Sequence, residues 1–208
     1  MEAIEDDPNE LAIDVKIFRA GLSCLGKTFN NARHAYLRLN IAEKGLSTLK
    51  GIERYKYLQY IDVSGNFLSS LKHIGEIKHL VKLNASNNRL RKMLDFQPPA
   101  NLEEVNYSNN EITVIENVCF NPYLKVLRLD SNQIEKIEGI MSNKSLISLS
   151  LRQNNITKIE NLDGLNLEEL CLSNNSITKI SGLSNLPCLR ELDISKNAIR
   201  HLVGLQDI

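Results

Sequence analysis

Large aliphatic side chains recur at a fixed interval along most of this chain. The clearest copy is residues 124–140, LKVLRLDSNQIEKIEGI, which has the pattern L-x-x-L-x-L-x-x-N-x-I-x-x-I-x-G-I. The pattern starts again every 22 residues, with one step of 21, at Tyr36, Leu58, Leu80, Leu102, Leu124, Leu146, Leu167 and Leu189. A fixed period maintained over this much chain predicts a solenoid of stacked repeats rather than a globular domain with one central core.

Each copy contains two kinds of local pattern. The L-x-L part alternates apolar and polar residues, which predicts a short strand with its leucines turned inward. The remaining residues are enough for the crossover that parallel strands require. We therefore expect an α/β solenoid, a right-handed superhelix with a parallel concave sheet of about eight strands. The return arms should be short helical or 3-10 turns, or extended where Pro98 and Pro99 exclude a helix.

An asparagine occupies the turn after nearly every predicted strand. A side-chain amide both donates and accepts hydrogen bonds, so each asparagine can satisfy backbone groups in its own turn and in the next turn. The first copy has Lys44 at this position. The predicted structural ladder consists of Asn66, Asn88, Asn110, Asn132, Asn154, Asn175 and Asn197.

The residues outside the repeats suggest one protected end and one open end. Residues 1–9 are acidic and predict a flexible tail, and residues 10–35 predict an N-terminal cap. Apolar residues of the cap, including Phe18, Leu22 and Leu25, have helical spacing, although Ile13 to Ile17 alternate as in a strand. The array, residues 36–208, has no polar C-terminal cap. We expect either a truncated product of a longer protein or an end that docks another chain.

Composition excludes several classes of function. The chain has 25 basic and 25 acidic residues, and this balance gives no basic face for nucleic acid. No apolar run is long enough to span a membrane, and the acidic first residues do not resemble a secretory signal. The four cysteines form no C-x-x-C pair, which favours free thiols in a reducing, cytoplasmic setting.

One segment matches an enzyme motif. Residues 21–28, GLSCLGKT, fit G-x-x-x-x-G-K-T, in which backbone N–H groups cradle a phosphate. Such a loop needs a strand before it and a helix after it, but the following residues run directly into the first repeat. The alternative interpretation is that Leu22 and Leu25 anchor the cap. We therefore expect no catalytic residues, metal site or cofactor.

The repeats, with I-x-x-I-x-G-L after the asparagine, resemble the short 22-residue class of leucine-rich repeat proteins. The cap GLSCLGKTF with HAY, the segment LNASNN followed by FQPPANL, and LCLSNN are similar to the repeat region of leucine-rich repeat and guanylate kinase domain-containing proteins. A radial-spoke leucine-rich repeat family is similar at the cap and in its repeats. This resemblance implies a protein-interaction scaffold in cilium or flagellum (axoneme) assembly or in sperm formation. The same repeat class includes a protein phosphatase 1 regulator, so a phosphatase-binding role is the alternative.

The predicted strands turn a set of variable side chains outward on one face. Hot spots of protein interfaces favour tyrosine and arginine, and Tyr60 is the one aromatic residue among these positions. Acidic residues gather near the C-terminal end and favour a basic partner there. The candidate protein-binding residues are Arg38, Tyr60, Asp62, Lys82, Asn84, Glu104, Asn106, Arg128, Asp130, Arg152, Glu169, Glu191 and Asp193.

Overall fold

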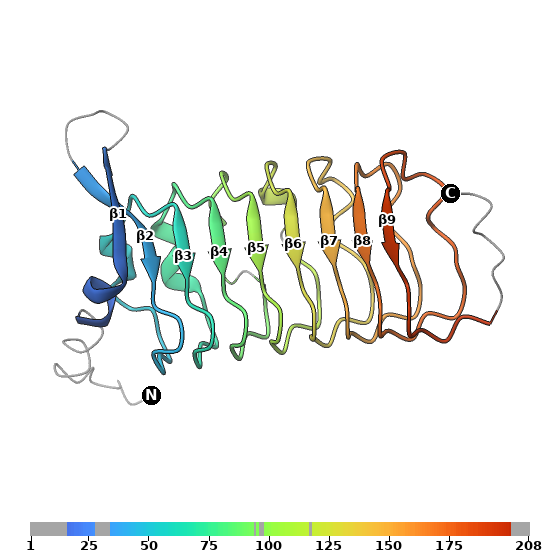
Figure 1. Ribbon diagram of the computed structural model, residues 1–208, viewed down its shortest axis with the longest axis horizontal. Helices are drawn as coiled ribbons and strands as arrows, with labels where there is room; N and C mark the ends of the chain where they lie inside the picture. The colour runs from blue at the N-terminus through green and yellow to red at the C-terminus, as the bar shows by residue number, and fades with distance from the viewer. Residues whose placement is uncertain (1–15, 28–33, 94, 96–97, 117, 201–208) are drawn as a thin grey trace, which may run out of the picture.

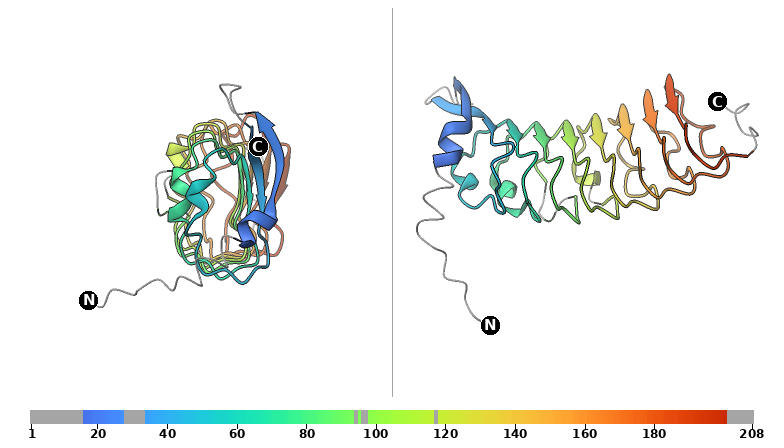
Figure 2. Two further views of the ribbon diagram at one scale, coloured as in Figure 1. Left: turned by 90° about the vertical axis from the view of Figure 1, so that its left-hand side faces the viewer. Right: turned by 60° about the horizontal axis from the view of Figure 1, so that its bottom comes forward.

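The computed structural model describes residues 16–27, 34–93, 95, 98–116 and 118–200. The chain forms an elongated solenoid with one strand per repeat along one side (Figure 1). An end-on view shows the strands on one side of the coil and short helical turns on the other (Figure 2). The predicted leucine-rich repeat architecture is therefore confirmed.

The strands form one nine-stranded sheet in chain order. From β2 onward each strand pairs in parallel with the next, whereas β1 pairs antiparallel with β2. The described strands are β1 Leu22–Lys27, β2 His34–Asn40, β3 Tyr60–Asp62, β4 Lys82–Asn84, β5 Glu104–Asn106, β6 Val126–Arg128, β7 Ser148–Ser150, β8 Glu169–Cys171 and β9 Glu191–Asp193.

The return arms contain little helix, as predicted. The 3-10 helices are η1 Ile52–Arg54, η2 Lys72–Glu76 and η3 Val118–Phe120. The described part of the arm that contains Pro98 and Pro99 has no helix, because proline lacks the N–H that a helix interior requires. The 21-residue step is absorbed without loss of pairing, since Ser148 of β7 lies in register with Glu169 of β8.

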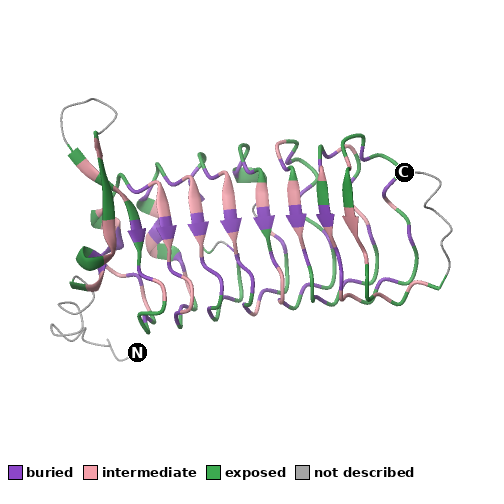
Figure 3. Ribbon diagram, in the orientation of Figure 1, coloured by how far each residue is buried: buried purple, intermediate pink, exposed green. Residues whose placement is uncertain are grey.

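Buried residues recur in every turn of the coil (Figure 3), and most of them are aliphatic. The residue that follows each parallel strand is fully buried from Ile41 to Leu172, as is the aliphatic residue after each turn from Leu68 to Ile177. Burying each such side chain stabilises the fold by about 1.5–3 kcal/mol before conformational entropy is considered. In the last described repeat, Leu192, Ile194 and Ile199 are only partly buried. Residues 201–208, at the end for which docking or truncation was predicted, lie outside the described residues.

The asparagine ladder is present, but its direction differs from the prediction. Asn66 donates from Nδ2 to the Ile41 carbonyl at 2.9 Å and to its own turn at the Val63 carbonyl, 2.8 Å. Its Oδ1 accepts the Leu46 N–H at 3.0 Å. Each asparagine therefore binds the preceding turn rather than the next one. This direction explains Lys44, because the first parallel repeat has no preceding turn of the same kind to stabilise.

The N-terminal cap differs from a single helix. Residues 16–21 are helical, and β1 then crosses the end of the sheet as an antiparallel strand. Phe18 is fully buried and packs edge-on against Tyr55, with ring centroids 6.4 Å apart. Leu25, predicted to anchor the cap, is 62% exposed. Phe18 therefore closes the core at this end. The predicted tail and residues 10–15 of the cap lie outside the described residues.

Tyr107 is the one aromatic side chain in the column of residues that follow the parallel strands. It is fully buried, and among the described residues its hydroxyl has no hydrogen-bond partner. Burial raises the pKa of Tyr107 well above its usual range, and the nearby negative charge of Asp95 raises it further.

We predict that Tyr107→Phe raises the free energy of unfolding at neutral pH by about 1–3 kcal/mol, because it removes a buried, unpaired hydroxyl. Above a pH of about 10 the unfolded tyrosine ionises while the folded one stays protonated, so the wild type loses a further ~1.4 kcal/mol per pH unit. Urea denaturation across this pH range should show the difference between the two proteins growing with pH. Tyr36→Phe, at a side chain that is 45% exposed, is the matched control. A less stable Tyr107→Phe protein at neutral pH would contradict this interpretation.

Candidate functional site

The flanking residues of each three-residue strand point out of the coil, because the middle residue is buried in the core. Register places these outward residues in two columns across the sheet, the first beginning with Arg38 and Tyr60 and the second with Asn40 and Asp62. Eleven of the thirteen predicted binding residues lie in these columns, and Asp130 and Arg152 follow the ends of β6 and β7. The structure therefore brings the whole predicted set onto one face.

Two hollows divide this face. The first, the β2–β6 groove, has a volume of about 330 Å³. It is lined by Arg38, Leu39, Asn40, Tyr60, Ile61, Asp62, Lys82, Leu83, Asn84, Glu104, Val105, Asn106, Val126 and Arg128. The second, the β6–β9 hollow, has a volume of about 450 Å³. It is lined by Arg128, Asp130, Ser148, Leu149, Ser150, Arg152, Glu169, Leu170, Cys171, Glu191, Leu192 and Asp193. Arg128 lies at the boundary between the two.

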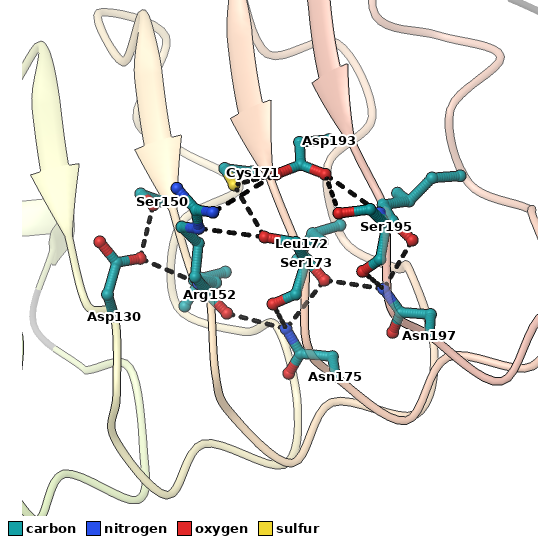
Figure 4. A network of polar contacts seen from close by, with 12 residues as sticks. Asp130, Ser150, Arg152, Cys171, Leu172, Ser173, Asn175, Asp193, Ser195 and Asn197 are labelled. Atoms are coloured by element: carbon teal, nitrogen blue, oxygen red, sulfur yellow. Dashed lines mark hydrogen bonds and ion pairs between the residues drawn. The ribbon is translucent and has the colours of Figure 1, made fainter.

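In the β6–β9 hollow, polar side chains largely bind one another (Figure 4). The Arg152 guanidinium donates from Nε to Ser173 Oγ at 3.0 Å and lies 3.9 Å from the Asp193 carboxylate. Cys171 Sγ donates to the same carboxylate at 3.3 Å. The hydroxyl and backbone N–H of Ser195 also donate to Asp193, and these hydrogen bonds hold the pKa of that carboxyl below its usual range.

The sequence-based interpretation did not include the bonding within this network. Asp130 accepts hydrogen bonds from the Ser150 hydroxyl and the Arg152 backbone N–H. The Arg152 side chain extends toward β8 and β9, where it contacts Ser173 and Asp193. Ser173, at a position where five of the eight repeats have serine, is the buried acceptor of the Arg152 hydrogen bond. Because serine at this position belongs to the repeat pattern, the sequence did not predict that Ser173 accepts a hydrogen bond from Arg152.

The described part of the GLSCLGKT motif does not form a phosphate-binding loop. Leu22–Lys27 is a strand whose residues pair with β2, with Lys27 opposite His34. A phosphate loop requires consecutive N–H groups that converge on an anion between a strand and a helix. An extended, paired strand cannot provide that arrangement. Thr28 lies outside the described residues.

The described part of the chain contains no metal site, membrane-spanning helix or disulfide. Within it, no group of three His, Cys, Asp or Glu side chains is placed to hold a metal ion. The helices that the structure describes are all too short or too polar to cross a bilayer. All four cysteines are free thiols, three of them exposed and Cys171 half-buried. The outer face of the sheet is therefore the candidate site.

Comparison with known proteins agrees with this architecture. Residues 165–204 match the family model described as leucine rich repeats (2 copies). Leucine-rich repeat-containing protein 23 of Xenopus tropicalis is 34% identical over 59 residues, which are 28% of this chain and only 17% of that protein. The match thus spans a small part of the relative's length.

Solved structures match over more of the chain. Internalin C2 of Listeria monocytogenes is 25% identical with a TM-score of 0.76, covering 81% of this chain and 75% of that one. A TLR13–ssRNA13 complex is 25% identical with a TM-score of 0.66, covering 83% of this chain and 26% of that one. By its repeats and its nine-stranded solenoid, the protein has the fold of the leucine-rich repeat proteins.

Proposed function

We propose that this protein is a non-catalytic scaffold that holds another protein on the outer face of strands β2 to β6. The β2–β6 groove carries the proposal, because it is a continuous hollow across five strands lined by polar and aliphatic side chains and by Tyr60. The fold itself is secured by the buried aliphatic residues and the asparagine ladder, whereas Tyr60 and the polar side chains of the groove are partly or fully exposed. Residues that the fold does not need are free to recognise a partner.

The groove has the composition of a binding surface. Buried aliphatic residues, including Leu39, Ile61 and Leu83, form its floor. Tyr60 is half-buried, and the Arg38 guanidinium lies 5.2 Å from the centre of its ring. Tyrosine and arginine on a rigid floor are the side chains that most often dominate the energy of protein interfaces.

The cellular setting is also a proposal. The cap and the FQPPANL segment resemble leucine-rich repeat and guanylate kinase domain-containing proteins, and the cap and the repeats resemble radial-spoke repeat proteins. We accordingly place the protein in the cytoplasm of ciliated or flagellated cells, with a partner in cilium or flagellum assembly. Proximity labelling in a ciliated cell tests this setting separately from the binding face.

The double variant Tyr60→Ala/Arg128→Ala tests the binding face. We predict that it lowers capture of the partner by tenfold or more, since losing one interface hot spot costs about 1–2 kcal/mol and each 1.4 kcal/mol is tenfold in affinity. Immobilised wild type and variant would be compared on extract from ciliated cells by quantitative mass spectrometry.

The matched control is Phe67→Ala/Arg89→Ala. This pair likewise removes one aromatic ring and one guanidinium, but neither residue lines the groove. Thermal denaturation would show that both variants remain folded. Equal capture by the Tyr60/Arg128 variant and the wild type would refute the proposed face.

A further inference from the structure

We infer that the β2–β6 groove binds an extended peptide segment that presents two acidic side chains about six residues apart, one to Arg38 and the other to Arg128. This inference rests on the proposed function and names the chemistry of the partner. The inference follows from a difference between the charged groups of the groove: its carboxylates have partners within the protein, whereas its two arginines have no polar partner among the described residues.

The carboxylates of the groove are engaged within the protein. Glu104 forms an ion pair with Lys82 across β4 and β5. Asp62 accepts the Ser64 backbone N–H at 3.0 Å and the Ser64 hydroxyl at 2.6 Å. Its second oxygen accepts the Asn84 amide at 3.2 Å. Neither carboxylate is therefore poised to attract a basic residue of a partner.

The two arginines of the groove, unlike its carboxylates, have no polar partner among the described residues. Arg38 and Arg128 are exposed, and among the described residues neither guanidinium has an ion-pair or hydrogen-bond partner. Arg38 is held over the Tyr60 ring, which orients it at one end of the groove. With Lys82, the groove has three cationic and two anionic side chains, and hence an excess of one positive charge. A guanidinium binds a carboxylate through two parallel hydrogen bonds, so an acidic side chain fits each end.

The distance between the arginines sets the spacing of the acidic residues. Arg38 lies on β2 and Arg128 on β6, four strands further along the sheet. Neighbouring strands are about 4.8 Å apart, so the two backbone positions are separated by about 20 Å, or about six residues of an extended peptide.

The neighbouring hollow fixes where an acidic segment can lie. Glu169 of β8 and Glu191 of β9 are direct neighbours across the sheet, and neither is in an ion pair with a described residue. Two adjacent carboxylates repel an acidic segment that shifts toward β9. The face therefore favours one placement, over β2 to β6.

Selection of displayed random peptides on the immobilised full chain tests the inference. We expect the selected peptides to be enriched in Asp or Glu pairs about six residues apart. Binding of a selected synthetic peptide should weaken about tenfold in Arg38→Ala/Arg128→Ala and should weaken as salt is raised. The matched single control Arg89→Ala, at an exposed arginine outside the groove, should bind like the wild type.

Each other outcome overturns the inference. The inference is wrong if the selection yields no peptides, or if the selected peptides lack acidic pairs. It is also wrong if a selected peptide still binds the Arg38→Ala/Arg128→Ala variant as tightly as the wild type. Single-stranded RNA would be titrated in parallel, and saturable RNA binding that needs the same arginines would reassign the groove to a nucleic acid. If acidic peptides fail while Tyr60→Ala/Arg128→Ala still abolishes partner capture, the scaffold function stands and only the acidic segment is wrong.

Discussion

Asn110→Ala should lower the free energy of unfolding by about 3–5 kcal/mol, because it leaves several buried backbone groups unpaired at about 1–3 kcal/mol each. The Asn110 amide donates to the carbonyls of Ala85 and Tyr107 at 3.0 and 2.9 Å. Its Oδ1 accepts the Leu90 N–H at 3.0 Å. Ala85 and Leu90 belong to the preceding repeat, so the substitution weakens two repeats and the contact between them.

Urea denaturation followed by circular dichroism measures this loss. The neighbouring Asn109→Gly is the control, because Asn109 is exposed and has a φ of 56°, which glycine adopts without strain. We expect that control to remain within about 0.5 kcal/mol of the wild type. A loss of less than about 1 kcal/mol for Asn110→Ala would show that the ladder is not a principal source of stability.

Gly139→Ala should destabilise the protein by about 3–4 kcal/mol, which is a large effect for one methyl group. Gly139 has a φ of 73°, and a Cβ atom placed there would lie 2.4 Å from the Ile115 carbonyl oxygen of the preceding repeat. Strain and a clash with backbone therefore add together. Gly182 repeats this geometry, with a φ of 71° and 2.5 Å to the Ile159 oxygen.

Gly45→Ala separates the effect of backbone strain from the effect of the steric clash. Gly45 has nearly the same φ, 71°, but a Cβ atom there would meet nothing within 4 Å. We expect that variant to lose only about 1–2 kcal/mol, the cost of a left-handed conformation for an L-residue. Comparable losses for Gly139→Ala and Gly45→Ala would mean that the close approach to Ile115 relaxes.

The repeat period predicted the array well for a physical reason. Each inner strand pairs with the copies before and after it in sequence, so burial of Leu127 is fixed by local alternation and by the two adjacent repeats. The cap did not follow from local pattern. Helical spacing was predicted as far as Leu25 and strand alternation only at Ile13 to Ile17, whereas Leu22–Lys27 form a strand because β1 pairs with β2.

The sequence predicted which residues lie on the candidate face, but not which of them bind one another. Outward positions follow from the strand pattern, and the structure places all thirteen residues on one side. Which charges remain unpaired depends on rotamers and on residues one repeat away. Arg152 reaches Ser173 and Asp193, whereas Arg128 reaches no described acceptor. That difference decides which arginine is available to a partner.

Site-specific photo-crosslinking in ciliated cells tests most directly whether the partner lies on the outer face of the sheet. Benzoylphenylalanine would replace Val126, which lines the β2–β6 groove, or Phe120 of η3, which is 53% exposed on a return arm. We expect a crosslinked partner from position 126 and none from position 120. A partner crosslinked from position 120 alone would place binding on the return arms and contradict the proposed binding face.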